Sequence, residues 1–457
     1  MQYHLKISGK MHTDLKRHLF PGDGREAIAL ALCGRHKNDK NDYFLVHDIC
    51  FIPHEQCSIR ESYRVTWPTE ALEPLIDNAI KNGFAILKIH SHPTGYNSFS
   101  DTDDASDKAV FEYIHACINN DLPQVSAVML PDGKIFARAI TSTLEFIPVQ
   151  MVSVAGDNLH FWFHERLTSN DEMTKRIRQA FGEGTVDLLK NLKIAIVGCS
   201  GTGSPTIEAL IRNGVGKVVL VDPDKVEKKN LNRILNTTLS DAIEGRLKVE
   251  VLKEAIEQIG FNTEVIVYPV NLFDSKEAIR EIASCDIIFG CTDSIDSRHL
   301  LNHISTFYLI PYFDMGVKLL SDGQGGIDQI TGAVHYIQPG GSSLLSRGVY
   351  TLEKLRAANL IRTDPAEYAR QRKFGYIVDI EVESPAVISI NMHVSSIAVN
   401  DFLARIHPYR FMNNSKCACT LMDFSDWNMQ TLEDGEPDKY LKKYVGRGYM
   451  PRLLNLL

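Results

Sequence analysis

The chain has 457 residues, of which 44% are hydrophobic and 23% charged, and its formal net charge is −8. This composition excludes a disordered, collagen-like or disulfide-scaffold chain, and a nucleic-acid binder would normally show a basic excess instead. No apolar run reaches the ~18 residues of a membrane helix, and the first residues contain no apolar signal segment. The nine cysteines are scattered without a C-x-x-C pair. We therefore expect free thiols in a cytoplasmic protein that has neither membrane nor nucleic acid as a partner.

The first part of the chain, residues 1–150, is predicted to be an α/β domain. A strand-like apolar run at 84–89 leads directly into a histidine-containing loop, and a helical stretch passes through 110–114. Residues 151–171 have weak hydrophobic periodicity. We interpret them as a linker.

A second α/β domain is predicted over residues 172–410. A charged helix at 172–189 precedes a buried-strand pattern at 193–197, a glycine-rich turn, a helix and a second strand at 217–222. This is a βαβ unit, the beginning of a doubly wound, Rossmann-like sheet. The remainder, residues 411–457, is a C-terminal segment to which we assign no role.

The loop in the first domain has the pattern H-x-H-P-x6-S-x-x-D, formed by His90, His92, Ser100 and Asp103. Two histidines at i and i+2 of an extended segment point to the same side, and the later carboxylate can supply a third ligand. Three protein ligands leave the fourth position of Zn²⁺ open for water, as in a catalytic site. A general base is still needed, and Glu26, at the head of an apolar run, is the candidate. Ser100 can donate a hydrogen bond to a developing oxyanion.

These residues together resemble the motif of the JAMM (JAB1/MPN) metalloproteases. The resemblance implies that His90, His92 and Asp103 bind zinc, that Glu26 is the acid/base and that Ser100 supports the tetrahedral intermediate. It also implies a JAMM/MPN-type α/β fold and cleavage after the C-terminus of a ubiquitin-like protein. The alternative is that the histidines are structural residues of an inactive copy.

A second constellation begins at the glycine turn, which has the spacing G-x-x-G-x-G. Glycines between a strand and a helix let the backbone approach phosphate, and the helix N-terminus attracts the anion. A carboxylate at the end of the next strand is suited to ribose hydroxyls, and cations beside a carboxylate suit ATP with Mg²⁺. In chain order the candidates are Gly198, Gly201, Gly203, Asp222, Asp224, Asn230, Arg233, Lys248 and Asp293.

This ordered set resembles the ubiquitin-activating superfamily, which includes the ThiF and MoeB adenylyltransferases, over roughly 172–407. The resemblance implies that the glycine turn and Asp222 hold ATP, that Asp293 places Mg²⁺, and that the cations and Asn230 contact phosphates. It further implies a homodimer through the adenylation domain, in which Arg178 reaches into the partner's active site.

The sequence departs from this family at its covalent nucleophile. Relatives that form such an intermediate have a C-L-x-C pair after a P-G dipeptide, whereas here both positions are serine, Ser343 and Ser346. Three explanations remain open. Ser343 forms an oxyester with the help of an unidentified base; the enzyme stops at adenylation; or Cys417 or Cys419 supplies the thiol.

The fusion of the two resemblances predicts a bifunctional enzyme of a bacterial ubiquitin-like pathway. Zinc-dependent trimming or deconjugation would act on the modifier's C-terminus, and ATP-dependent adenylation would then activate it for transfer to a conjugating enzyme. Phage defence is a further expectation of the resemblance. Two alternatives stay open: adenylation of a sulfur-carrier protein for cofactor biosynthesis, and a non-catalytic module that binds a ubiquitin-like protein.

Overall fold

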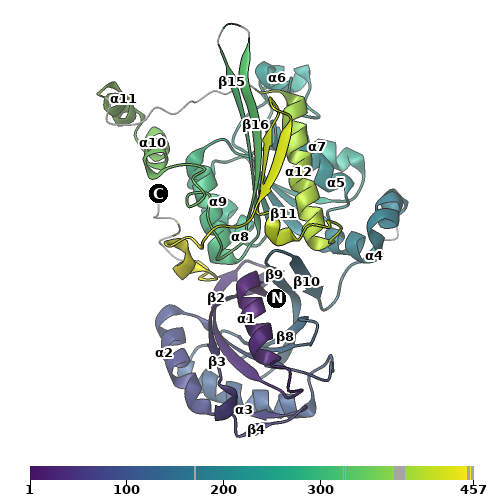
Figure 1. The fold of residues 1–457 in the computed structure, drawn as a ribbon, viewed down its shortest axis with the longest axis vertical. Helices are drawn as coiled ribbons and strands as arrows, with labels where there is room; N and C mark the ends of the chain where they lie inside the picture. The colour runs from purple at the N-terminus through teal and green to yellow at the C-terminus, as the bar shows by residue number, and fades with distance from the viewer. Residues whose placement is uncertain (169–170, 323, 325, 375–385, 450–452, 454–457) are drawn as a thin grey trace. The chain divides into compact units, whose positions relative to one another are not determined.

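The computed structural model describes residues 1–168, 171–322, 324, 326–374, 386–449 and 453. They divide into two compact units (Figure 1). The first consists of residues 1–165 with short segments at 306–309 and from residue 443, and the second of most of 166–442. Among the described residues, no helix is both long and apolar enough to cross a membrane.

The first unit contains ten strands and three α-helices, as the chain order shows. They are β1 (Gln2–Ser8), α1 (Gly9–Leu19), β2 (Ile28–Lys37), β3 (Asn41–Phe51), β4 (Ile59–Arg60), β5 (Val65–Thr66), α2 (Glu73–Asn82), β6 (Ala85–Ser91), α3 (Asp101–Ile118), β7 (Gln124–Met129), β8 (Ile135–Ile140), β9 (Phe146–Ala155) and β10 (Leu159–Phe163).

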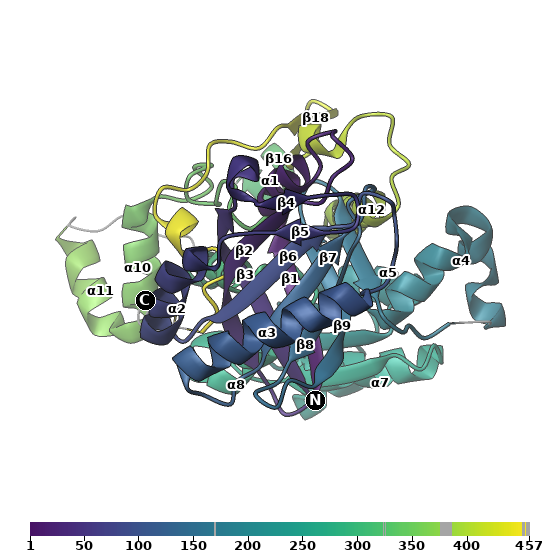
Figure 2. The same cartoon turned by 90° about the horizontal axis from the view of Figure 1, so that it is seen from below.

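Its main sheet has the strand order β1-β3-β2-β6-β7-β8-β9-β10, and β1 also pairs with β9, so the sheet closes on itself. Both faces of β6 are buried because alternate residues enter two different cores. Leu87 and Ile89 belong to the core inside the closed sheet, whereas Ile86 joins the core that lies under α2 and α3. His90 has the same parity as Ile86, so the alternation turns it toward α3, which runs across the strands (Figure 2).

The first residues of the linker predicted over 151–171 form strands in the structure. Residues up to Ala155 continue β9, and β10 pairs with it antiparallel from Leu159↔Ala155 to Phe163↔Met151. The periodicity is weak here because residues 151–155 of β9 are buried on both faces of the sheet, so they lack the alternation of a half-exposed strand.

The remaining elements, most of them in the second unit, begin with the predicted helix and βαβ unit. They are α4 (Lys175–Asn191), β11 (Lys193–Val197), α5 (Gly203–Arg212), β12 (Lys217–Val221), α6 (Leu239–Glu244), α7 (Lys248–Ile259), β13 (Glu264–Tyr268), α8 (Lys276–Ala283), β14 (Ile287–Gly290), α9 (Ile295–Tyr308), β15 (Tyr312–Ser321), β16 (Ile327–Ile337), α10 (Leu352–Thr363), α11 (Pro365–Lys373), α12 (Ile388–Ile406), β17 (Cys419–Asp423) and β18 (Asn428–Leu432).

The second sheet has the order β13-β12-β11-β14-β15-β16-β17-β18. The pairs from β13 to β15 are parallel and those from β15 to β18 are antiparallel. Helices α5, α7 and α12 lie on one face, and α8 and α9 on the other (Figure 1). The chain reverses its direction of winding between β11 and β14, and ligands of open α/β sheets bind at such a switch point.

The segment 411–457, to which the sequence assigned no role, contributes to both units. β17 and β18 extend the second sheet by pairing next to β16, and residues 443–449 belong to the first unit. Short strands that pair with a strand more than eighty residues earlier have no local signal in the sequence.

Candidate functional site

The first unit brings together the three predicted metal ligands, His90, His92 and Asp103, which we call the metal-ligand set. The two histidine Nε2 atoms are 3.1 Å apart. The Asp103 carboxylate oxygens lie 2.9 Å from His90 Nε2 and 3.4 Å from His92 Nε2. Ligand atoms about 2.0–2.1 Å from a tetrahedral zinc ion lie about 3.3 Å from one another. The donor types, their burial and their separations therefore fit Zn²⁺.

Local contacts orient these ligands. The ring Nδ1 of His92 lies 2.7 Å from the Tyr96 carbonyl, which fixes the tautomer and leaves Nε2 for a metal. Asp103 is held at the first turn of α3 by a capping box, in which the Ser100 hydroxyl accepts from the Asp103 N–H and donates to its Oδ2 over 2.7 Å. The structure thus gives Ser100 a capping role beside the metal-ligand set, and its contact with an oxyanion stays a prediction.

Glu26 lies at the same point, as the sequence predicted. Its carboxylate and the two histidine nitrogens all lie within 4.8 Å of one another. Burial raises the pKa of Glu26 to about 7, which suits a group that must both take up and release a proton near neutrality. The Arg60 Nε donates to the Glu26 carbonyl and fixes its backbone.

The second unit contains a cavity of about 560 Å³ at the carboxyl edge of its parallel strands, which we call the nucleotide cavity. Residues that follow β11, β12, β13 and β14 line it, so it lies at the topological switch point. Of the sequence-predicted residues, the cavity brings together Gly198, Asp222, Asp224, Asn230, Arg233, Lys248 and Asp293.

Lys248 is the buried cation of the nucleotide cavity, with 4% of its surface exposed. Its ammonium lies 2.8 Å from the Asp224 carboxylate and 3.7 Å from that of Asp222. Asp222 also accepts from the Cys199 N–H over 2.7 Å and from the Asp224 N–H over 2.9 Å. Burial raises the pKa of Asp222, and Lys248 opposes that effect. The Asp222 carboxylate therefore stabilises the glycine turn and also lines the cavity.

The three glycines of the turn have different structural roles. Gly198 lines the cavity at a φ of +90°, a conformation that side chains disfavour. Gly203 does not line it, but a Cβ there would lie 2.0 Å from the Gly198 carbonyl oxygen. Gly201 also lies outside the lining, where a Cβ would meet the Asn391 side chain of α12 at 2.4 Å. These two glycines allow the close packing that the turn requires.

Sequence reasoning missed several residues of the nucleotide cavity. Lys229 lines it directly before Asn230, and Asn271 lines it shortly after β13. Lys229 could have been found from the sequence because it is adjacent to Asn230, a predicted phosphate contact. Asn271 could have been found because it follows the carboxyl end of a parallel strand. Arg178, Ser343 and Ser346 do not line this cavity in the described part of the chain.

Ser343 is 1% exposed, and its hydroxyl donates to the Asp438 carboxylate. The Ser343 N–H donates to the Ser346 hydroxyl over 2.8 Å, so the two serines form one turn. Asp438 itself accepts from the N–H groups of Tyr440 and Leu441. The base that the sequence left unidentified thus has a candidate 95 residues further along the chain.

The other predicted residues have contacts of their own. Arg178 donates to the Thr174 hydroxyl over 2.8 Å at the start of α4. Cys417 and Cys419 are both buried. Burial raises the pKa of Cys419 to about 11, and its Sγ lies 4.0 Å from His335 Nε2.

The ThiF family model matches residues 174–436, more than half of the 457-residue chain. The chain belongs to the ThiF family. The match starts at α4, includes the whole nucleotide cavity and continues through β17 and β18. The mixed α/β fold and the adenylation-type domain predicted from the glycine turn and its companions are therefore confirmed, and we call residues 174–436 the ThiF domain.

Two curated relatives each match about a third of the chain. The chain is 38% identical over 146 residues to the adenylyltransferase and sulfurtransferase UBA4 of Meyerozyma guilliermondii, which is 32% of this chain and 33% of that protein. It is 36% identical over 139 residues to the molybdopterin-synthase adenylyltransferase of Escherichia coli, which is 29% of this chain and 54% of that protein. The chain thus spans a third to a half of the length of these relatives.

Among solved structures, the chain is similar to the microcin C7 biosynthetic enzyme MccB in complex with N-formylated MccA, with a TM-score of 0.46 and 18% identity. That match covers 59% of this chain and 74% of the other. Escherichia coli MccB with ATP gives a TM-score of 0.44 at 17% identity, with the same coverage.

Proposed function

We propose that the ThiF domain adenylates the C-terminus of a small carrier protein, either ubiquitin-like or a sulfur carrier, with ATP. The observation that carries this proposal is the nucleotide cavity, which Arg233, Lys229 and buried Lys248 line together with the carboxylates of Asp222 and Asp293. A carrier carboxylate oxygen would attack the α-phosphorus of ATP, forming the acyl–AMP anhydride and releasing pyrophosphate. The names of the curated relatives support a sulfur carrier as one substrate class.

Four side chains of the nucleotide cavity would each have a role in this reaction. Asp222, directly after β12, would bind the ribose hydroxyls. Lys248, Arg233 and the N-terminus of α5 would stabilise the charge that develops on the phosphates. Mg²⁺ held by Asp293 would neutralise the leaving pyrophosphate.

The test is ATP–pyrophosphate exchange by the purified full chain, with a panel of purified carrier proteins that end in Gly-Gly. Exchange that depends on one carrier and is lost in Asp293→Ala is the expected result. Failure of every carrier to stimulate exchange, in a protein that binds ATP, would contradict adenylation of this substrate class.

The first unit, we propose, is a zinc hydrolase of the JAMM type that trims or releases the same carrier. The metal-ligand set carries this proposal, because three buried donors converge at zinc-compatible separations with Glu26 beside them. Zn²⁺ bound there would acidify a water molecule and polarise the scissile carbonyl. Glu26 would take the proton from that water and return it to the leaving amine. The carboxylate left at the carrier's C-terminus is the substrate of adenylation.

For the step after adenylation we propose Ser343 as the acyl acceptor, with Asp438 as its base. The hydroxyl would attack the acyl carbon of the anhydride, Asp438 would take its proton, and AMP would leave. The direct contact between the two side chains supports this choice. An oxyester would then be handed to a conjugating enzyme, with Arg178 serving the partner subunit of a homodimer.

Ser343→Ala tests the acceptor step. With ATP, Mg²⁺ and the carrier that stimulates exchange, intact-mass spectrometry should find an adduct of wild type that survives reducing agent and is lost in mild base. The adduct should be absent in Ser343→Ala and present in Ser346→Ala, the matched control from the same turn. Acyl-AMP in solution with no adduct on wild type would mean that the enzyme stops at adenylation.

A further inference from the structure

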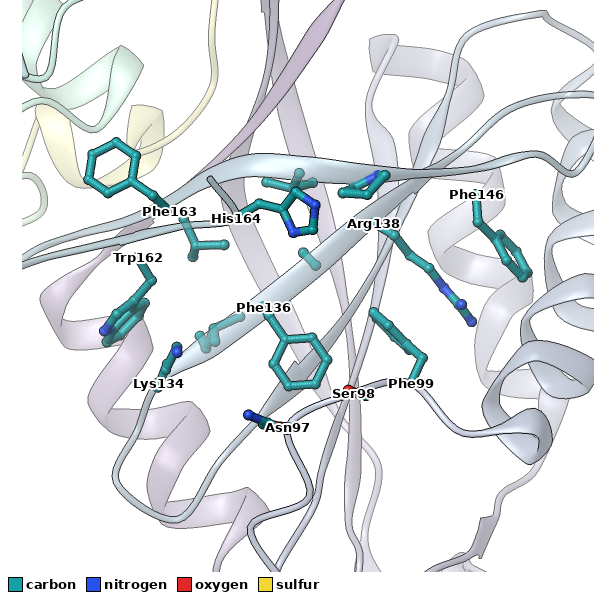
Figure 3. A pocket seen from close by; sticks show the side chains of 15 residues that line it. Asn97, Ser98, Phe99, Lys134, Phe136, Arg138, Phe146, Trp162, Phe163 and His164 are labelled. Carbon is teal, nitrogen blue, oxygen red and sulfur yellow. The ribbon is translucent and has the colours of Figure 1, made fainter. Parts of the chain in front are cut away.

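A hollow in the first unit has no part in the reactions proposed above. Its volume is about 450 Å³, and it lies between the loop residues Asn97–Phe99, β8 and the end of β10 (Figure 3). Phe136, which Figure 3 shows within the hollow, connects it to the metal-ligand set. Its ring meets the His92 ring edge to face at a centroid distance of 6.4 Å and the Phe99 ring at 5.2 Å. A group bound in the hollow is therefore a neighbour of the metal-ligand set.

One wall of the hollow is the edge of a strand. β8 pairs with β7 along its length, from Met129↔Ile135 to Gln124↔Ile140, but with β9 only from Arg138↔Pro148 to Ile140↔Phe146. Beyond Pro148 the register of β9 against β1 shifts, and β9 pairs with β10 instead. Among the described strands, residues 135 and 136 thus have a neighbour on one side only.

The free side of this edge faces the hollow. The Leu130 N–H donates to the Lys134 carbonyl over 2.8 Å, so Lys134, Phe136 and Arg138 direct their main-chain groups toward β7. The N–H groups of Ile135 and Ala137 consequently face away from β7, and both residues line the hollow. An open strand edge of this kind is a template for an added peptide strand.

The side chains around the edge form a preset aromatic pocket. The Trp162 ring is stacked on His160 at 5.4 Å with an interplanar angle of 8°. The Arg138 guanidinium lies 3.8 Å from the Phe99 ring centroid and 3.8 Å from that of Phe146. Rings that are already held in place cost little conformational entropy on binding, so the pocket suits an aromatic or large aliphatic side chain.

We propose that this hollow binds an extended peptide segment adjoining the scissile bond. The segment adds to the free edge of β8 as a strand and places an aromatic or large aliphatic side chain among Phe99, Phe136 and Trp162. Two residues of extended chain span about 6.6 Å, close to the 6.4 Å between the Phe136 and His92 rings, so we place this anchor about two residues from the bond that is cut. The inference rests on the proposed zinc hydrolase function and adds a sequence preference to it.

Short peptide hydroxamates test the hollow on the zinc-loaded full chain without turnover. The hydroxamate anchors each compound at zinc, and two compounds differ only in Phe or Gly two residues away. Each pair of compounds is made with the peptide running in either direction from the hydroxamate, so that the peptides occupy either side of the scissile bond. For one of the two chain directions, the Phe compound should bind about tenfold more tightly than the Gly compound. This gain is the contribution expected from one aromatic side chain in the pocket. Trp162→Ala should reduce this advantage to less than about twofold.

Phe161→Ala is the matched control, because Phe161 precedes Trp162 on β10 and does not line the hollow. It should keep the preference for Phe. Hydrogen–deuterium exchange supplies a second readout, since an added strand should slow exchange of the Ala137 amide about tenfold, whereas a pocket that holds a side chain alone would leave it unchanged.

The outcomes separate this inference from the hydrolase function. If the Gly compounds bind in a zinc-dependent manner and Phe adds nothing in either direction, the hollow is not a peptide site while the zinc site stands. Preference for Phe with unchanged exchange at Ala137 would overturn strand addition. If no hydroxamate binds, both proposals fall together.

Discussion

At the scale of single residues, Lys229 is a cation at the nucleotide cavity that the sequence patterns did not single out. It lines the cavity, and its ammonium is 3.3 Å from the exposed Glu227 carboxylate. We predict that Lys229→Ala raises the KM for ATP about fivefold in pyrophosphate exchange, because an exposed ion pair contributes up to about 1 kcal/mol. Lys228→Ala, the neighbour outside the lining, should leave the KM unchanged. Equal effects of the two substitutions would mean that Lys229 does not contact the nucleotide.

The residues that sequence could predict are those whose partners lie in the same motif. His90, His92 and Asp103 lie on one strand–loop–helix segment, and their spacing alone indicated convergence. Asp438 could not be found in this way, because its contact with Ser343 depends on the path of the chain after β18. Glu26 was proposed from its place at the head of an apolar run, and its position beside the ligands follows from the pairing Ile28↔His90 of β2 with β6.

At the scale of elements, a buried ion network ties α3 to the strands that carry the metal ligands. Asp107, one turn after Asp103, lies 2.6 Å from the Lys88 ammonium of β6 and 2.7 Å from the Arg138 guanidinium of β8. Lys88 precedes His90 by two residues and faces the same side of β6. The network therefore fixes the helix that presents Asp103 against the strand that presents His90.

We predict that Asp107→Asn weakens zinc binding about 10- to 100-fold, the usual effect of losing a group that orients a ligand. A chelator-competition titration measures this affinity. The same change should lower the stability of the first unit by about 3–5 kcal/mol, since it leaves Lys88 and Arg138 buried without their shared partner. Asp104→Asn is the matched control, because the Asp104 carboxylate also pairs with Arg138 but is 44% exposed. A loss of stability with unchanged zinc affinity would show that the network does not position the ligands.

The elements that the sequence predicted well are those with a strong hydrophobic periodicity of their own. The strand expected at 193–197 is β11, and the second strand of the βαβ unit is β12. β10, β17 and β18 were missed because each is short and depends on a partner strand rather than on its own pattern. The open edge of β8 was equally invisible, since it arises from the bend of a neighbouring strand.

At the scale of the whole molecule, the two sites lie in different units and are built from different residues. The metal-ligand set and Glu26 belong to the first unit, and the nucleotide cavity belongs to the second. We predict that removing zinc with a zinc-selective chelator in the presence of excess Mg²⁺ abolishes trimming of a carrier precursor and leaves pyrophosphate exchange with the mature carrier within about twofold of its starting rate. Added Zn²⁺ should restore trimming. Loss of both activities on chelation would contradict independent sites.

The most direct test of the two-site account uses one carrier, in precursor and mature form, and two variants. The substrate is a carrier precursor that extends beyond its terminal glycine, and intact-mass spectrometry in the presence of ATP, Mg²⁺ and Zn²⁺ follows its trimming and its conversion to the acyl adenylate. Glu26→Ala should leave the precursor uncut but still adenylate a carrier supplied in mature form, while Asp293→Ala should trim the precursor and form no adenylate. If either substitution abolished both activities in a folded protein, the account of two separate chemical sites in one chain would be wrong.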